Sequence, residues 1–231
     1  MVQPDKRATA VTRARYGRIA PFYNALEVLA ELRFRPWRER FWELVRPALP
    51  PGGWLLEVGV GTGKNLPYWP GEARISAIDL TPAMLQRARR RAERLGVEAQ
   101  LDLGDVQELA FPDNLFDVAA ATFVFCSVPD PVLGLRELRR VVRPGGAVVL
   151  MEHVLSENPL LSRAMDLLNP IVVRIMGANI NRRTVTNLEN AGLRLERVED
   201  LGASGIFKLV LARVPDQPEA ARSPGSSAPT S

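Results

Sequence analysis

The 231-residue chain has one cysteine, Cys126, and one histidine, His153. A single cysteine cannot form an internal disulfide, and one cysteine with one histidine cannot complete a Cys/His zinc site, so we expect no metal centre. No stretch of 18 uncharged apolar residues occurs, so no segment is expected to span a membrane. The first residues lack the apolar core of a secretion signal, which predicts a cytoplasmic protein.

Acidic charge is scarce at the beginning of the chain. The net charge is +4, and residues 1–46 carry ten basic and five acidic residues, so the remaining 185 residues sum to −1. There is no separate basic domain, and the arginine-rich stretch 87–94 has no aromatic residue to stack on bases, so nucleic acid is not an expected partner. The composition, 46% apolar and 24% charged, is that of a globular domain with a substantial core.

Short apolar runs alternate with amphipathic helical segments between residues 51 and 214. The predicted strands end near residues 57, 79, 103, 123, 151, 198 and 214, and the predicted longer helices begin near residues 81, 130 and 183. This alternation predicts right-handed βαβ crossovers. We therefore expect an α/β fold with a doubly wound, mostly parallel sheet and helices on both faces.

Four segments lie outside this alternation. Residues 1–12 are predicted to be a flexible arm, residues 13–50 a helical cap broken at Pro21 and Pro36, and residues 215–231 a disordered tail. The cap is basic and aromatic, so it either lies in a membrane interface or packs on the main domain. Residues 156–180 form an apolar insertion after the fifth strand, expected to be a lid over a lipophilic acceptor or a helix pair packed on the cap.

Three glycines follow the first predicted strand in the stretch Glu57-Val-Gly-Val-Gly-Thr-Gly63. They let the backbone turn tightly and let a flat ligand lie against main-chain N–H groups. Lys64 and Leu66 exclude the dinucleotide fingerprint G-x-G-x-x-G, and Val58 and Asn65 exclude the phosphate loop. The remaining pattern, acid-x-G-x-G-x-G, indicates a nucleoside-type ligand, and the alternative is a glycine-rich turn in another kind of α/β protein.

Polar residues follow the other predicted strands. Asp79 ends the second strand, near the offset of roughly 20 residues at which such sheets place a ribose-binding carboxylate. Asp105 follows the third strand, and residues 123–128 and 152–153 follow the fourth and fifth. Because ligands of doubly wound sheets bind at the carboxyl ends of the strands, we expect Glu57, Asp79 and Asp105 to surround a nucleoside-sized hollow floored by bare backbone.

From Tyr16 to about Val214 the chain resembles the class I S-adenosylmethionine (SAM)-dependent methyltransferases, in the group that includes the ubiquinone/menaquinone-biosynthesis enzymes. The residues that carry this resemblance are Leu56–Gly63, Ile78-Asp79, Gly104-Asp105, Phe116-Asp117 and Leu138–Gly146. The resemblance implies the strand order 3-2-1-4-5-7-6, SAM as cofactor and S-adenosylhomocysteine as product. Within the group, Arg15–Tyr23, Phe125–Pro129 and Glu152–Val154 are similar to bacterial phosphatidylethanolamine N-methyltransferases.

The same resemblance assigns roles by position. Gly59, Gly61 and Gly63 would line the methionine moiety, Asp79 would hold the ribose hydroxyls and Asp105 the adenine. The predicted cofactor-binding set is completed by Glu57, Leu80, Val106 and Phe123.

Candidate catalytic residues are fewer, because the SAM sulfonium is already an activated electrophile and the protein has mainly to align the acceptor and exclude water. An amine acceptor must also lose a proton, and His153 is the predicted base by its ordinary pKa. Glu152, Tyr16 or Tyr23 would assist instead, and either tyrosine could stack on a methylated cation. The alternative for His153 is a structural hydrogen bond at a strand end.

Three functions remain open at this point. The first is methylation of phosphatidylethanolamine or a similar lipid amine, with the enzyme in peripheral contact with an anionic membrane surface. The second is methylation of a quinone precursor, a thiol or another small hydrophobic molecule. The third is a SAM-binding regulator without turnover.

Overall fold

A computed structural model describes residues 3–26 and 28–216 of the chain. The strands are β1 (Trp54–Val58), β2 (Arg74–Asp79), β3 (Gln100–Leu103), β4 (Phe116–Thr122), β5 (Val142–His153), β6 (Arg194–Asp200) and β7 (Phe207–Arg213). The helices are α1 (Lys6–Leu26), α2 (Val28–Val45), α3 (Pro82–Leu95), α4 (Pro131–Val141), α5 (Pro159–Met176) and α6 (Thr184–Asn190), with short 3-10 turns at Arg46–Ala48 and Leu66–Tyr68.

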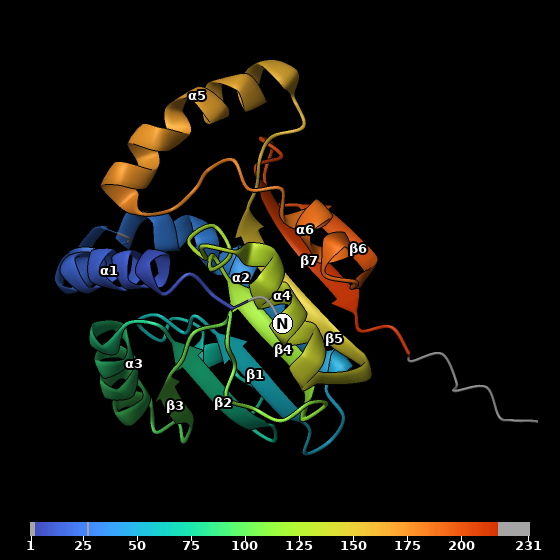
Figure 1. Cartoon of the computed structure of the whole chain (residues 1–231). Coiled ribbons are helices and arrows are strands. Elements are labelled where there is room, and N and C mark those ends of the chain that lie inside the picture. Colours follow the sequence, from blue (N-terminus) through green and yellow to red (C-terminus); the bar gives the residue numbers. More distant parts are fainter. Residues whose placement is uncertain (1–2, 27, 217–231) are drawn as a thin grey trace, which may run out of the picture.

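The seven strands form one sheet in the order β3-β2-β1-β4-β5-β7-β6 (Figure 1). Strands β1 to β5 pair in parallel, whereas β7 runs antiparallel to both β5 and β6. This confirms the predicted fold and strand order. The carboxyl ends of β1, β2, β3 and β4 therefore lie side by side along one edge.

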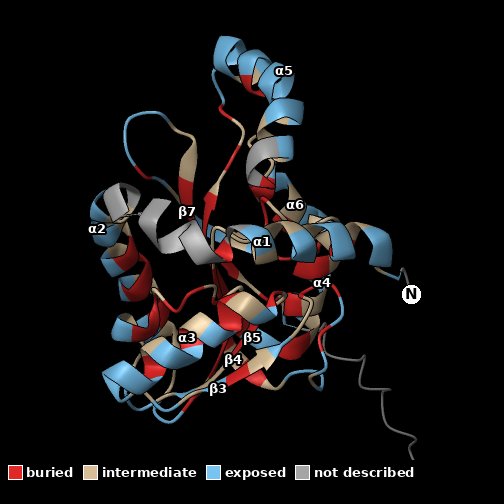
Figure 2. Cartoon of the chain, turned by 90° about the vertical axis from the view of Figure 1, so that its left-hand side faces the viewer, coloured by how far each residue is buried: buried red, intermediate tan, exposed pale blue. Residues whose placement is uncertain are grey.

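Helices cover both faces of the sheet, as predicted. Successive residues of a strand point to opposite faces, and Leu55 and Leu56 accordingly belong to different apolar clusters. Leu55 packs with Phe41 and Trp42 of α2, while Leu56 packs on the face covered by α4 and α6. Figure 2 shows the buried residues concentrated in the sheet and on the inner sides of these helices.

The N-terminal arm is shorter than predicted. Helix α1 begins at Lys6, not after residue 12, because the side chain of Asp5 accepts hydrogen bonds from the free N–H groups of Arg7 and Ala8 at 2.9 and 3.1 Å. Neither proline breaks its helix: α1 extends past position 21, and α2 continues through Pro36. Of the predicted disordered tail, residues 217–231 lie outside the described residues.

The insertion after β5 is one helix and not a helix pair. The side chain of Asn158 caps the start of α5, and Gly177, with a φ of 80°, ends it. In both views α5 stands away from the sheet (Figures 1 and 2), and its large apolar residues are exposed at Leu160, Leu161, Leu167, Leu168 and Ile171. Within the described part of the chain, no helix is both long and apolar enough to cross a bilayer.

The packing of α2 gives a stability prediction. Replacing the fully buried Phe41 with alanine should lower the free energy of unfolding by about 3–5 kcal/mol, because the deletion leaves a cavity between α2 and the sheet. The matched change Leu32→Ala removes a side chain of the same helix that is 73% exposed, and it should cost less than about 0.5 kcal/mol. Chemical denaturation measures both values, and equal losses would contradict this packing.

Candidate functional site

A cavity that opens to solvent lies at the carboxyl ends of the parallel strands. Seven of the nine predicted cofactor-binding residues line it, namely Gly59, Gly61, Asp79, Leu80, Asp105, Val106 and Phe123. The remaining walls include Thr12, Tyr16, Ile78, Thr81, Met84, Gly104, Thr122, Val124, Ser127, Val128 and Pro129.

The glycine loop after β1 forms one side of this cavity. Gly59, Gly61 and Gly63 all have positive φ, at 68°, 57° and 79°, a conformation that other residues rarely adopt. A Cβ on Gly59 would lie 2.3 Å from the Val124 side chain, so this glycine permits close packing. A Cβ on Gly61 would meet nothing nearer than 3.9 Å, so this glycine leaves open space beside the backbone for a ligand.

The third glycine and the acid before the loop do not line the cavity. A Cβ on Gly63 would lie 2.5 Å from Leu66 and 3.2 Å from the Ala88 backbone of α3, so this position serves packing. Glu57 is buried under the loop, where its carboxylate accepts hydrogen bonds from Asn65 at 2.8 Å and from the indole N–H of Trp69. Burial raises the pKa of Glu57 to about 7. The expected ring of three acids thus has two members at the cavity and one beneath its floor.

Asp79 ties the loop to the start of α3. Its Oδ2 accepts a hydrogen bond from the Gly61 N–H at 2.9 Å, and its Oδ1 accepts one from the Thr81 N–H at 2.8 Å. Burial raises the pKa of Asp79, and these two N–H donors oppose that rise. Each carboxylate oxygen can accept a further hydrogen bond, which suits a ligand carrying two hydroxyl groups.

Asp105 is held partly by a residue far away in the sequence. Its Oδ2 accepts a hydrogen bond from the Thr9 hydroxyl of α1 at 3.1 Å, and its Oδ1 accepts from the Gln107 N–H at 2.9 Å. Farther along α1, Thr12 and Tyr16 line the cavity. The spacing 9, 12 and 16 places these residues on one helix face. This spacing was not recognised because residues 1–12 were predicted to be a loose arm.

The four catalytic candidates are distributed unevenly. Tyr16 lines the cavity, and burial, with a smaller contribution from Cys126, raises the pKa of its hydroxyl. The Tyr23 side chain lies outside the described residues. His153 is absent from the cavity lining and packs edge-on against Phe207, with ring centroids 5.0 Å apart. Burial lowers the pKa of His153, and its Nδ1 has no hydrogen-bond partner among the described residues.

Glu152, the fourth candidate, lies fully buried behind the cavity wall. Its Oε1 accepts hydrogen bonds from the Val124 and Phe125 N–H groups at 2.8 and 3.0 Å. Phe123, just before them, has a φ of 59°, so the wall turns sharply there. Oε2 has no partner within the described chain, and burial raises the pKa of Glu152 to about 7. In this position Glu152 fixes the loop that follows β4.

Aromatic rings gather beside the cavity. We use the name aromatic cluster for Phe34, Trp37, Phe123, His153 and Phe207, whose neighbouring ring centroids lie 5.0–6.1 Å apart. Phe123 belongs both to this cluster and to the cavity wall. The cluster thus joins α2, β5 and β7 to the cavity and supplies an apolar surface next to it.

The cavity fits SAM in its chemistry. Asp79 and Asp105 offer acceptors for hydroxyl and amino groups, the open space beside Gly61 admits a ligand against bare backbone, and the apolar side chains of Ile78 and Val106 suit an adenine ring. The described residues include no group of three or more His, Cys, Asp or Glu side chains placed to hold a metal ion.

Comparisons with known proteins agree with this geometry. The family model "Methyltransferase domain" matches residues 56–150. A phosphatidylethanolamine N-methyltransferase of Cereibacter sphaeroides is 43% identical over 104 residues, which are 44% of this chain and 51% of that protein. A ubiquinone/menaquinone biosynthesis C-methyltransferase UbiE of Roseobacter denitrificans is 32% identical over 183 residues, which are 77% of this chain and 72% of that protein.

Solved structures share the fold at lower identity. The crystal structure of the [4+2]-cyclase SpnF superposes with a TM-score of 0.65 and 21% identity, covering 78% of this chain and 81% of that one. Because its name describes a different reaction, this likeness supports the fold alone.

Burial of Glu152 gives a pH prediction. Between pH 4.5, its ordinary pKa, and about pH 7, the folded protein keeps a proton on Glu152 that the unfolded chain has lost. The contribution of Glu152 to the free energy of unfolding therefore falls as the pH rises through this window and is level above it. In Glu152→Gln the amide oxygen still accepts from the Val124 N–H, but the side chain no longer titrates. The free energy of unfolding of this variant, relative to that of the wild type, should therefore rise by on the order of 1–3 kcal/mol from pH 5 to pH 8.

Glu137 is the control for this titration. Burial raises its pKa, but hydrogen bonds from Arg140 and from the Leu109 N–H outweigh that effect and leave the pKa below its ordinary value. The difference between Glu137→Gln and the wild type should therefore not grow above pH 5. Thermal unfolding at several pH values tests both variants, and parallel curves for Glu152→Gln and the wild type would show that Glu152 is not protonated in the folded state.

The strand order, the glycine loop and the cavity at the strand ends thus agree with a relative that is 32% identical across 72% of its own length. The predicted cofactor, SAM, is the cofactor of this family. The chain belongs to the class I SAM-dependent methyltransferases.

Proposed function

We propose that this methyltransferase acts on the amine of phosphatidylethanolamine or of a similar lipid. The observation that carries the proposal is a basic recess beside the cofactor cavity. This open recess is lined by Arg7, Arg15 and Arg182 and shares Thr12, Ser127 and Pro129 with the cavity. A phospholipid amine has a phosphodiester two carbons away from its nitrogen, so its head group matches a cationic recess next to the methyl donor.

The electrostatics of the basic recess support an anionic ligand. Arg182 donates through Nη2 to the Val128 carbonyl oxygen at 2.6 Å, while its buried Nε has no partner among the described residues. Burial lowers the pKa of Arg182, so the cost of desolvating its charge is only partly offset by neighbouring groups. Of the described residues that line the recess, Asp5 alone is acidic. A phosphate bound in the recess would neutralise its excess positive charge.

Residues of the cavity and of the aromatic cluster would carry out the rest of the reaction. Bound SAM supplies a methyl group already activated by the sulfonium. Positioning of the reacting groups in a dry site lowers such barriers by roughly 7–11 kcal/mol. Tyr16 keeps its proton near neutral pH because burial raises its pKa, so it would orient the acceptor and not remove a proton. His153, which burial keeps neutral, lies outside the cavity lining, so it would accept the amine proton only from an acceptor that extends into the aromatic cluster.

The exposed face of α5 supports peripheral contact with an anionic membrane. Leu160, Leu167 and Ile171 recur at helical spacing and are 77%, 79% and 58% exposed. Arg163 and Arg174 lie on the same helix, and residues 1–46 carry the excess positive charge. An apolar stripe flanked by basic residues is typical of helices that lie in a membrane interface.

A small hydrophobic acceptor, such as a quinone precursor or a thiol, is the second candidate. The aromatic cluster favours it, because Phe34, Trp37 and Phe207 offer flat apolar surfaces beside the cavity without using the basic recess. The UbiE relative also aligns with more of this chain than the phosphatidylethanolamine enzyme does. Labelled SAM with a bacterial lipid extract separates the two candidates, since label in methylated phospholipid supports the first and label only in a quinone or thiol fraction supports the second.

The basic recess gives a kinetic prediction. Arg182→Gln should raise the KM for phosphatidylethanolamine vesicles by about 10- to 100-fold, because it removes a charged hydrogen-bond donor from the phosphate. Arg13→Gln on the exposed side of α1 removes the same charge away from the recess and should change KM less than about twofold. Calorimetry with S-adenosylhomocysteine should give unchanged affinity for both. Equal KM values for Arg182→Gln and the wild type would rule out phosphate recognition by this arginine.

The apolar face of α5 gives a membrane prediction. The triple change Leu160→Ser, Leu167→Ser and Ile171→Ser should reduce flotation with anionic vesicles by about tenfold or more, because it removes roughly 2 kcal/mol of burial per side chain. Val198→Ser removes an exposed apolar side chain from β6 and should leave flotation unchanged. Absence of vesicle binding by the wild type at low salt would remove the membrane from the proposal.

A further inference from the structure

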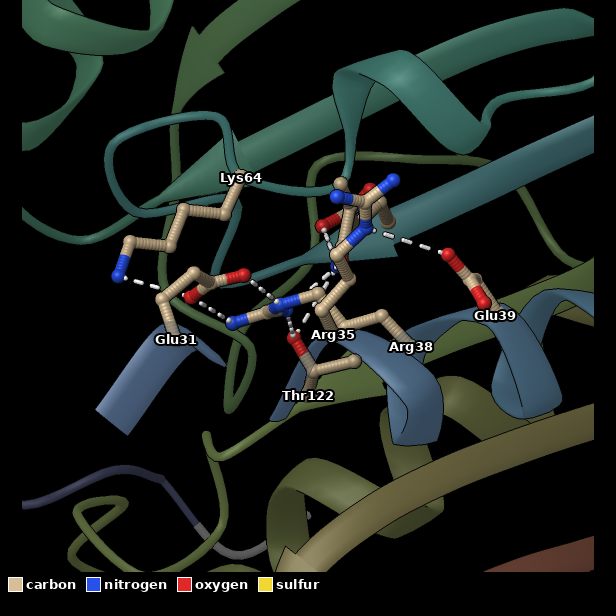
Figure 3. A network of polar contacts seen from close by, with 8 residues as sticks. Glu31, Arg35, Arg38, Glu39, Lys64 and Thr122 are labelled. Carbon is tan, nitrogen blue, oxygen red and sulfur yellow. Dashed lines mark hydrogen bonds and ion pairs between the residues drawn. The ribbon is translucent and has the colours of Figure 1, made fainter. Parts of the chain in front are cut away.

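A buried arginine of α2 reaches the glycine loop beside the cofactor cavity. Arg38 is 5% exposed, and its Nη1 donates to the Asn65 side-chain oxygen at 2.8 Å and lies 3.4 Å from the Thr122 hydroxyl. Asn65 in turn donates to the buried Glu57. Arg38 is therefore held beneath the glycine loop through Asn65, and Figure 3 shows it between Glu31 and Thr122.

One carboxylate of the chain lies between two cations at this place. Glu31 accepts hydrogen bonds from Arg38 Nε at 2.9 Å and Nη2 at 3.4 Å, and its Oε2 lies 2.9 Å from the Lys64 ammonium (Figure 3). Burial raises the pKa of Glu31, but the two cations outweigh it and hold the pKa below its ordinary value. Glu31 is therefore ionised at neutral pH and compensates a buried positive charge.

A small recess of about 350 Å³ adjoins these cations. Arg38, Lys64 and Asn65 line it, and it shares Gly59, Gly61 and Phe123 with the cofactor cavity. A ligand lying along the glycine loop would extend from one into the other. The two ends of this path differ in charge, with Asp79 and Asp105 at one end and the cations at the other.

SAM has a matching polarity. Its nucleoside end offers hydroxyl and amino donors, which suit carboxylates, and its amino-acid tail ends in an α-carboxylate, which carboxylates would repel and a guanidinium and an ammonium would bind. We propose that Arg38 and Lys64 bind the α-carboxylate of the cofactor, and that Glu31 occupies this position in the free enzyme and is displaced on binding. Cofactor binding thereby competes with an ion pair of α2.

This inference does not depend on the identity of the methyl acceptor, and equilibrium binding tests it without turnover. Arg38→Met should weaken S-adenosylhomocysteine binding by about 10- to 100-fold, and Lys64→Met by somewhat less. Both should leave the affinity for S-adenosyl-3-thiopropylamine, the same molecule without its carboxylate, within twofold of the wild type. Glu31→Gln should tighten S-adenosylhomocysteine binding by about three- to tenfold, because the neutral amide competes less well for the two cations.

A matched control lies on the same helix. Arg35 and Glu39 form an exposed ion pair at 3.3 Å (Figure 3), and Arg35→Gln should leave both affinities unchanged. Thermal melting first checks that each variant is folded, and Lys64→Met and Glu31→Gln carry the test where Arg38→Met does not fold. Equal weakening of the two ligands would show that the cations only support the loop. An unchanged or weaker affinity in Glu31→Gln would show that Glu31 does not occupy the carboxylate position.

Discussion

The site depends on a stretch of bare backbone held open at the end of β1. Gly61, which has a positive φ, has no side chain that could hold the loop by packing. The loop therefore takes its shape from hydrogen bonds to buried acids. Asp79 holds it from one side, and Glu57 fixes Asn65 beneath it. Burying these carboxylates is unfavourable, as their raised pKa values indicate, and the donors around them offset part of that cost. Contacts within the chain therefore shape this side of the cavity.

The strands and loops that line the cavity could largely be predicted from the sequence, because their signals are local. The apolar strands, the glycine spacing and an acid at each strand end placed Asp79 and Asp105 correctly beside the cavity. Glu57 and Gly63, which were predicted to bind the cofactor with them, do not line the cavity. Residues at a strand end can point into a cavity or under its floor, and only the packing of Trp69 and Ala88 decides which.

The contacts that α1 and α2 make with the site could not be predicted, because they join residues far apart in the chain. Thr9 meets Asp105 across 96 positions, and Arg38 meets Thr122 across 84. No periodicity encodes such pairs. The start of α1 was missed because one side chain, that of Asp5, nucleates a helix in a stretch that otherwise looks like a loose polar arm. The motif-bearing strands thus build one side of the cavity, and contacts from α1 and α2 close it.

The position of β7 has a consequence for how the chain is made. Strand β7 comes after β6 in the sequence, yet it lies between β5 and β6. Until Phe207–Arg213 has left the ribosome, the apolar strand β5 keeps an unpaired edge, which is a template for intermolecular pairing. The parallel strands around the cofactor cavity can assemble earlier. A nascent chain would therefore need protection of that edge late in synthesis, after its cofactor-binding half has formed.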